Sequence, residues 1–241
     1  MTAFSLHGQT ALVTGANTGI GQAIAVALAQ AGADVIAAGR RDCDETLVRM
    51  GSGRALQLDF ADPMAARDVF AQNHIDILVN NAGIIRRADA VDFTESDWDD
   101  VMDVNMKALF FTCQAFARAA LPRGRGKIIN IASLLSFQGG IRVPSYTASK
   151  HGVAGLTKLL ANEWAAQGLN VNAIAPGYIE TNNTEALRAD PDRSRAILER
   201  IPAGRWGQPE DIAQTAVFLA APASDYINGA ILNVDGGWLA R

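Results

Sequence analysis

The chain has 241 residues, of which 49% are hydrophobic and 19% are charged. This composition is too apolar for a disordered protein, and a chain of this length needs no disulfide or metal to hold its core. Its 21 basic and 25 acidic residues give a net charge of −4, so neither nucleic acid nor an anionic membrane is an expected partner. The polar opening and the lack of an apolar run of about 18 residues predict a cytoplasmic protein without a leader or a membrane span.

Short apolar or β-branched runs alternate with longer segments of helical pattern along the whole chain. The strand-like runs lie at residues 10–14, 34–38, 54–58, 75–80, 127–132, 170–175 and 230–234. Apolar residues recur at helical spacing in residues 21–30, 63–72, 96–121, 146–167 and 209–220. Repeated alternation of strand and helix predicts parallel pairing with crossover helices on both faces of one sheet. We therefore predict a Rossmann-type α/β fold, with a doubly wound, parallel, seven-stranded sheet in a single domain of residues 1–241.

One segment, residues 178–207, breaks this alternation because it is polar and rich in arginine. Insertions after the carboxyl ends of strands in such sheets usually cover the ligand crevice. We therefore predict that residues 178–207 form a flap over the substrate.

The first predicted strand runs into a loop with three glycines, which precedes a predicted helix. Gly15 permits a tight turn, Gly19 lets backbone N–H groups approach a pyrophosphate, and Gly21 allows the helix to pack closely on the strand. The helix N-terminus also favours a phosphate. We expect dinucleotide contacts from the loop residues Gly15, Asn17, Thr18, Gly19, Ile20 and Gly21. The alternative is a tight turn that uses glycine without any ligand.

The type of dinucleotide depends on the end of the second predicted strand, which reads Gly39-Arg40-Arg41. An acidic residue there would bind both ribose hydroxyls and repel a 2′-phosphate. Gly39 leaves room for that phosphate and Arg40 supplies charge, which favours NADP. The alternative is that the arginines stack on the adenine or lie in solvent.

Three residues that suit proton transfer follow in the second half of the chain. Ser133 ends a predicted central strand, and Tyr146 and Lys150 lie one helical turn apart on one face of a predicted helix. A cation about 4 Å from a phenol contributes about 4 kcal/mol at an effective dielectric of about 20, before opposing desolvation is subtracted. We therefore expect Lys150 to lower the pKa of Tyr146 and make it a general acid/base near neutral pH. Ser133 could hydrogen-bond the reacting oxygen.

Several motifs in this order resemble the short-chain dehydrogenase/reductase family along the whole chain. They are TGANTGIG (14–21), NNAG (80–83), VNMKALFF around Asn105, IASLLSF (131–137), YTASK (146–150) and NAIAPGYIET (172–181). The resemblance implies that Tyr146 is the acid/base, that Lys150 also binds the nicotinamide ribose, and that Ser133 orients the substrate oxygen. It implies that Asn105 holds a water in a proton relay, although hydrogen bonding inside its helix is an alternative role.

The same resemblance implies further cofactor contacts, and no metal is expected. Asp59 would contact adenine, although a capping role is the alternative. The remaining cofactor residues implied in this way are Phe60, Asn81, Ala82, Gly83, Pro176, Gly177, Ile179 and Thr181.

Residues 136–165, 200–207 and 235–241 are similar to a branch of the family that acts on a hydroxyl or ketone of a six-carbon sugar acid. This branch implies NAD, and we expect NAD on the strength of the resemblance, with the NADP favoured by Gly39 and Arg40 as the alternative. Arginines suit an anionic substrate because they bind carboxylates bidentately. They occur here in the flap and as Arg86, Arg87 and Arg142. The candidate substrate residues are Ser133, Gln138, Arg142, Tyr178 and Asn183, of which Arg142 is the first choice among the arginines.

The rival enzymes are a gluconate-type dehydrogenase and a 3-oxoacyl-thioester reductase, and a non-catalytic dinucleotide sensor is the rival outside enzymes. The polar flap argues against a long acyl chain. Family members generally form tetramers through the long helices and the C-terminal strand. Apolar residues on more than one face of the predicted helix, namely Leu109, Phe110, Phe111 and Phe116, suit that homotetramer.

Overall fold

Seven parallel strands form one sheet in the order β3-β2-β1-β4-β5-β6-β7 in a computed structural model, which describes residues 3–240. The strands are β1 (Thr10–Thr14), β2 (Asp34–Gly39), β3 (Arg54–Gln57), β4 (Ile77–Asn80), β5 (Gly126–Ile131), β6 (Leu169–Pro176) and β7 (Ile231–Val234). The α-helices are α1 (Gly19–Gln30), α2 (Asp44–Met50), α3 (Val69–Gln72), α4 (Glu95–Met102), α5 (Leu109–Ala120), α6 (Pro144–Trp164), α7 (Glu185–Ala189), α8 (Pro191–Leu198) and α9 (Pro209–Ala220). The predicted doubly wound, seven-stranded fold is confirmed.

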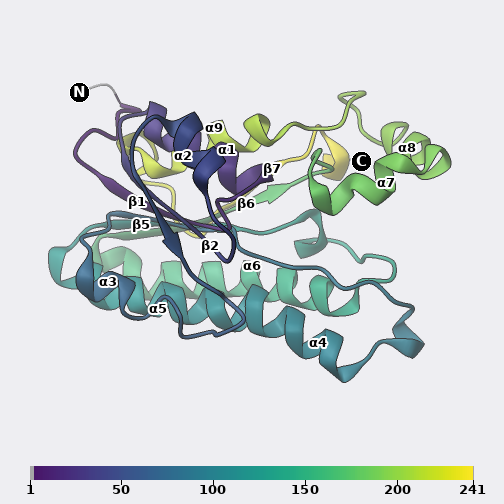
Figure 1. The fold of residues 1–241 in the computed structure, drawn as a ribbon, viewed down its shortest axis with the longest axis horizontal. Coiled ribbons are helices and arrows are strands. Elements are labelled where there is room, and N and C mark those ends of the chain that lie inside the picture. Colours follow the sequence, from purple (N-terminus) through teal and green to yellow (C-terminus); the bar gives the residue numbers. More distant parts are fainter. Residues whose placement is uncertain (1–2, 241) are drawn as a thin grey trace.

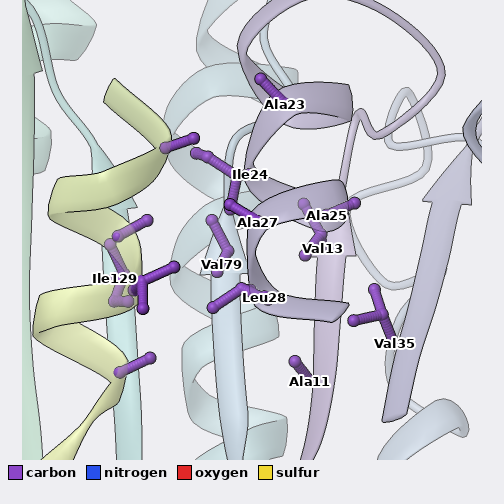
Figure 2. Packing of buried hydrophobic residues seen from close by; sticks show 14 of the residues in the cluster. Ala11, Val13, Ala23, Ile24, Ala25, Ala27, Leu28, Val35, Val79 and Ile129 are labelled. Carbon is purple, nitrogen blue, oxygen red and sulfur yellow. The ribbon is translucent and has the colours of Figure 1, made fainter. Parts of the chain in front are cut away.

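Helices cover both faces of this sheet, as Figure 1 shows, with α3 to α6 on one face and α1, α2 and α9 on the other. Consecutive residues of β1 therefore lie in different layers of the core. Ala11 and Val13 pack in the layer of α1 and α9, whereas Leu12 packs in the layer of α5 and α6. Figure 2 shows Ile24 and Leu28 of α1 in the first of these layers, beside Val79.

Two predicted helices differ from the observed ones. In the predicted helix 63–72 only Val69–Gln72 is α-helical, because the preceding residues form separate turns, with Ala65 N–H donating to Asp62 and Arg67 N–H to Met64. The predicted helix 96–121 is divided into α4 and α5 by a π-helical segment, η2 (Asp103–Ala108). Helix α2 and the two helices within residues 178–207 were not predicted.

Residues 178–207 start from the carboxyl end of β6 and lie at one side of the molecule near the C-terminus (Figure 1). A parallel bridge joins Ile179 to Gly207 at the two ends of the segment. Between these ends lie α7 and α8. Ile197 of α8 is buried in a third apolar cluster, together with Leu134 and Trp238. None of the helices within residues 3–240 combines the length and hydropathy needed to cross a membrane.

Candidate functional site

The glycine loop between β1 and α1 lies directly against the turn after β4. Gly15 has a φ of +64°, and a Cβ there would lie 2.9 Å from both Ala82 Cα and the side-chain nitrogen of Asn81. A Cβ on Gly21 would collide with the carbonyl oxygen of Gly15. Gly19, at φ +58°, meets nothing closer than Thr181 at 3.4 Å. The loop is therefore tightly packed at Gly15 and Gly21 and open at Gly19, where α1 starts.

Thr14 links this loop to the turn after β4 through hydrogen bonds. It is the first residue of the motif TGANTGIG (14–21), but the motif does not reveal this role. Its hydroxyl oxygen accepts the backbone N–H groups of Asn81 and Ala82, each at 3.0 Å. The Asn81 side chain donates in return to the carbonyls of Thr14 and Gly15, at 3.0 and 3.1 Å. Because Thr14 is only 1% exposed, these bonds are shielded from water and hold both loops in one geometry.

A cavity of about 640 Å³ opens beside the loop. It is lined by eleven of the predicted cofactor residues: Gly15, Asn17, Thr18, Ile20, Arg40, Asp59, Phe60, Asn81, Ala82, Gly83 and Thr181. The predicted substrate residue Asn183 lines it as well, together with Arg86, one of the arginines expected to suit an anionic substrate. Asp100 and Asp103, which the motifs did not indicate, complete this part of the lining. Its size, its glycine-lined wall and the free N–H groups at the start of α1 suit a dinucleotide.

The other predicted cofactor residues lie outside the lining of this cavity. Gly19 and Gly21 belong to the first turn of α1, and Pro176 ends β6. Gly177, which follows, donates its N–H to Val234 in β7, and Ile179 is buried.

At the end of β2 the cavity wall is basic. Arg40 and Arg41 are exposed and line the cavity, and within residues 3–240 neither guanidinium has an ion-pair partner. A side chain on Gly39 would press against Asn17 Oδ1 at 3.3 Å, so a larger residue there would narrow the space between the two loops. Asp59 also lines the cavity, and its Oδ1 accepts the N–H of Ala61 within a local turn. The next helix, α3, starts only at Val69, so this bond does not cap a helix.

Ser133, Tyr146 and Lys150 meet at the carboxyl end of β5. Ser133 follows this strand, and its side chain accepts the N–H of Leu135 at 3.2 Å. The Lys150 amine lies 5.5 Å from the centre of the Tyr146 ring and donates to the Ile131 carbonyl at 2.7 Å. The predicted meeting of the three residues is therefore present in the structure.

The predicted lowering of the Tyr146 pKa is not found. Burial raises the pKa of Tyr146, and a hydrogen bond with Ser133 and the charge of Arg87 oppose this in part. Burial also lowers the pKa of Lys150 to about 8. Desolvation therefore has a larger effect on Tyr146 than any neighbouring cation in the protein alone.

Asn105 is held in the π-helical segment η2 and is 1% exposed. Its side chain accepts the N–H of Ile84 at 2.8 Å and donates to the Ile84 carbonyl at 2.9 Å. Its amide nitrogen also lies 3.3 Å from the Ser149 hydroxyl on α6. These bonds run between elements, so the alternative of bonding inside its own helix is wrong.

The three remaining candidate substrate residues, Gln138, Arg142 and Tyr178, lie in two further places. Tyr178 packs edge-on against Trp206, with ring centres 5.5 Å apart, and against Trp238 at 4.7 Å, while Gln138 accepts the Trp238 indole N–H at 3.1 Å. Arg142 instead forms an exposed ion pair with Asp89 at 3.1 Å, on the surface.

The arginine that approaches the tyrosine is Arg87. Its charge acts on Tyr146, and its guanidinium donates to the Asn183 carbonyl at 3.0 Å. The sequence favours Arg142 over Arg87 because Arg142 lies between Ser133 and Tyr146. It does not show that Asp89 folds close enough to form an ion pair with Arg142.

This fold and this site define an NAD(P)-dependent oxidoreductase. Residues 15–239 match a short-chain dehydrogenase model whose description is enoyl-(acyl carrier protein) reductase. The chain belongs to the short-chain dehydrogenase/reductase family, and the predicted family is thereby confirmed.

Relatives extend over the full length of the chain. It is 60% identical to the 2-dehydro-3-deoxy-D-gluconate 5-dehydrogenase of Bacillus subtilis (strain 168), over 99% of this chain and 98% of the relative. A crystal structure of a candidate 2-deoxy-D-gluconate 3-dehydrogenase from Agrobacterium tumefaciens with bound NADP is 72% identical, with a TM-score of 0.99 and 100% of both chains covered. A gluconate 5-dehydrogenase from Burkholderia cenocepacia J2315 in complex with NADP and tartrate is 40% identical, with a TM-score of 0.94 and coverage of 99% and 98%.

Proposed function

We propose that the protein is an NADP(H)-dependent dehydrogenase that interconverts a hydroxyl and a ketone on a six-carbon sugar acid of the 2-dehydro-3-deoxy-D-gluconate type. The observation that carries this proposal is the meeting of Ser133, Tyr146 and Lys150 beside a glycine-lined cavity. The names of the full-length relatives support the substrate class.

In the oxidation direction, Tyr146 as phenolate takes the proton of the substrate hydroxyl, while Ser133 hydrogen-bonds the same oxygen. A bound nicotinamide supplies the acceptor for the hydride that leaves the carbon. Lys150 holds a positive charge beside Tyr146 and provides a donor for the ribose. Asn105 fixes the Ile84 backbone and contacts α6 at Ser149, so it keeps the Tyr146 helix in register with the turn after β4.

Arg87 is the residue we assign to the substrate carboxylate. It has no ion-pair partner within residues 3–240, and its charge acts on Tyr146. Its hydrogen bond to Asn183 also joins it to residues 178–207. Because Arg142 is already paired with Asp89, a substrate carboxylate there would have to compete with that ion pair.

NADP is proposed over NAD because Arg40 and Arg41 line the cavity without acidic partners among the described residues, and because two of the similar crystal structures hold NADP. Arg40→Ala and Arg41→Ala should each raise the KM for NADP about tenfold, the loss expected for one charge-assisted hydrogen bond, and leave the KM for NAD unchanged. Equal effects on both nucleotides would contradict a 2′-phosphate site.

The remaining assignments concern the whole molecule. We propose that residues 178–207 form the substrate flap, that the protein is cytoplasmic, and that it forms a homotetramer through α4, α5 and α6. Leu159 and Trp98 are exposed apolar residues on these helices, whereas Leu109 and Phe116 are buried in the protomer and offer no surface to a partner. Light scattering coupled to gel filtration measures the mass directly.

The decisive experiment replaces Tyr146 with Phe and follows reduced cofactor by absorbance with a panel of aldonic and ketodeoxy acids. Turnover should fall by about 10²- to 10⁴-fold, the usual contribution of a general acid/base, while cofactor affinity by fluorescence titration stays unchanged. Tyr226→Phe, at a fully exposed tyrosine, is the matched control. Unaltered turnover would refute the role of Tyr146, and reduction of acyl thioesters alone would favour the rival reductase.

A further inference from the structure

Arg142 lies in the loop between Ser133 and Tyr146 and has an unusual backbone conformation. Its φ is +63°, and within residues 3–240 it is the one non-glycine residue with a positive φ. A residue with a Cβ adopts this left-handed conformation only at an energetic cost. Such strain persists where surrounding contacts hold it, and it is frequent at functional sites. The contacts of Arg142 therefore bear on the function of this loop.

Two contacts hold Arg142, and both are made with the segment that follows β4. Its carbonyl accepts the N–H of Ala88 at 3.2 Å, and its Nε lies 3.1 Å from Asp89 Oδ1. One contact involves the backbone of Arg142 and the other its side chain, and they bind two consecutive residues of the other segment. The loop that carries Arg142 is thereby fixed to this segment at two points.

The same two segments carry Arg87 and Tyr146. Arg87 directly precedes Ala88 in the chain, and Tyr146 lies in the first turn of α6, four residues after Arg142. The two side chains are close enough for the charge of Arg87 to act on the Tyr146 phenol. A displacement of one segment relative to the other would therefore change the distance between Arg87 and Tyr146.

We propose that Arg142 and Asp89 are positioning residues, whose contact holds Arg87 beside Tyr146 in the place from which it binds the carboxylate of the substrate. This inference rests on the proposed sugar-acid dehydrogenase function, in which Arg87 binds that carboxylate. Arg142 acts through Asp89 and Ala88 and does not bind the substrate itself. Because the ion pair is exposed, its loss should weaken substrate binding moderately and not abolish it.

The sign of the effect of Asp89→Ala distinguishes positioning from direct electrostatics. This variant removes a negative charge close to Arg87 and frees the guanidinium of Arg142. If charge alone mattered, or if Arg142 bound the carboxylate, an anionic substrate would bind more tightly to the variant. If the ion pair positions Arg87, the substrate binds less tightly. The two interpretations therefore predict opposite changes in KM.

The test measures kcat and KM for the sugar acid that the wild-type protein oxidises fastest, at a pH where its activity no longer changes. Asp89→Ala and Arg142→Gly should each raise KM about three- to fivefold, the effect of one exposed ion pair, and should leave kcat within about twofold. Glycine adopts a positive φ without strain, so Arg142→Gly removes the ion pair without disfavouring the observed backbone. Its midpoint of urea unfolding should stay close to that of the wild type.

A double-mutant cycle tests whether the ion pair acts through Arg87. Arg87→Gln should raise KM about tenfold, and Asp89→Ala should raise it no further in that background, because effects that act through one group are not additive. Asp34→Ala is the matched control. Asp34 is 59% exposed, against 64% for Asp89, and it also pairs with an arginine, Arg54. It starts β2 at the amino end of the sheet, away from the site, and its replacement should leave KM unchanged.

The outcomes separate the two proposals. If the wild-type protein oxidises no sugar acid with either nucleotide, the proposed function fails before Arg142 is considered. If it oxidises one, and Asp89→Ala or Arg142→Gly lowers KM or leaves it unchanged as Asp34→Ala does, the positioning role is wrong and the function stands. The role is equally wrong if Arg87→Gln leaves KM unchanged, or if the increases from Arg87→Gln and Asp89→Ala multiply in the double variant.

Discussion

Lys150 holds its charge in a place from which water is largely excluded. It is 5% exposed, and burial lowers its pKa from the usual 10.5 to about 8. The folded protein therefore binds this proton less tightly than the unfolded chain does. The resulting penalty on folding is complete below the folded pKa of about 8 and fades as the pH rises toward 10.5. At about 1.4 kcal/mol per pH unit, it is about 3 kcal/mol at pH 7 and about 1 kcal/mol at pH 10.

Lys150→Met removes this penalty and leaves the Ile131 carbonyl without its donor, which costs about 1–2 kcal/mol. The variant should therefore be inactive and yet more stable than the wild type by about 1–2 kcal/mol at pH 7, with no gain at pH 10. Urea unfolding at one fixed protein concentration measures both values. Lys158→Met, at an exposed position two turns further along α6, should leave the free energy of unfolding unchanged at both pH values. A loss of stability at pH 7, or an equal difference at both pH values, would refute the reasoning.

Three other substitutions test the site. Thr14→Val keeps the shape of the side chain and orphans the N–H groups of Asn81 and Ala82, so the free energy of unfolding should fall by about 2–4 kcal/mol in urea titrations; an unchanged midpoint would contradict this. Gly21→Ala should abolish cofactor binding measured by fluorescence, since its Cβ collides with the Gly15 carbonyl, and retained affinity would show that the loop can yield. Arg87→Gln removes a cation that lowers the pKa of Tyr146, so the acidic limb of kcat/KM for oxidation, along which activity rises as Tyr146 loses its proton, should move to higher pH; a downward move would reverse the assigned sign.

Features set by local spacing were predictable from the sequence. The strand β1, the glycine loop and the start of α1 follow from an apolar run, from glycines at fixed intervals and from helical periodicity. The same holds for Tyr146 and Lys150, because one turn of helix places both on one face whatever surrounds them. Such features require no knowledge of distant segments.

Features that depend on a distant partner were not predictable. The role of Thr14 requires Asn81 and Ala82 to arrive at its hydroxyl, and the roles of Arg87 and Arg142 depend on Asn183 and Asp89. A helical pattern also continues through η2, because a π-helical turn keeps the same residue types and changes only the hydrogen-bond register.

The pKa values show most clearly why spacing alone was insufficient. The distance between a phenol and an amine suggested that the cation controls the phenol, yet burial acts on both groups and drives each toward its neutral form. Tyr146 is thereby kept protonated in the protein alone, which is the form that donates a proton to a ketone. Ser133 and Arg87 act in the opposite sense and favour the phenolate that oxidation needs. The pKa of Tyr146 is therefore set by its burial together with Ser133 and Arg87. Lys150 supplies a buried positive charge, which lowers the free energy of unfolding at neutral pH.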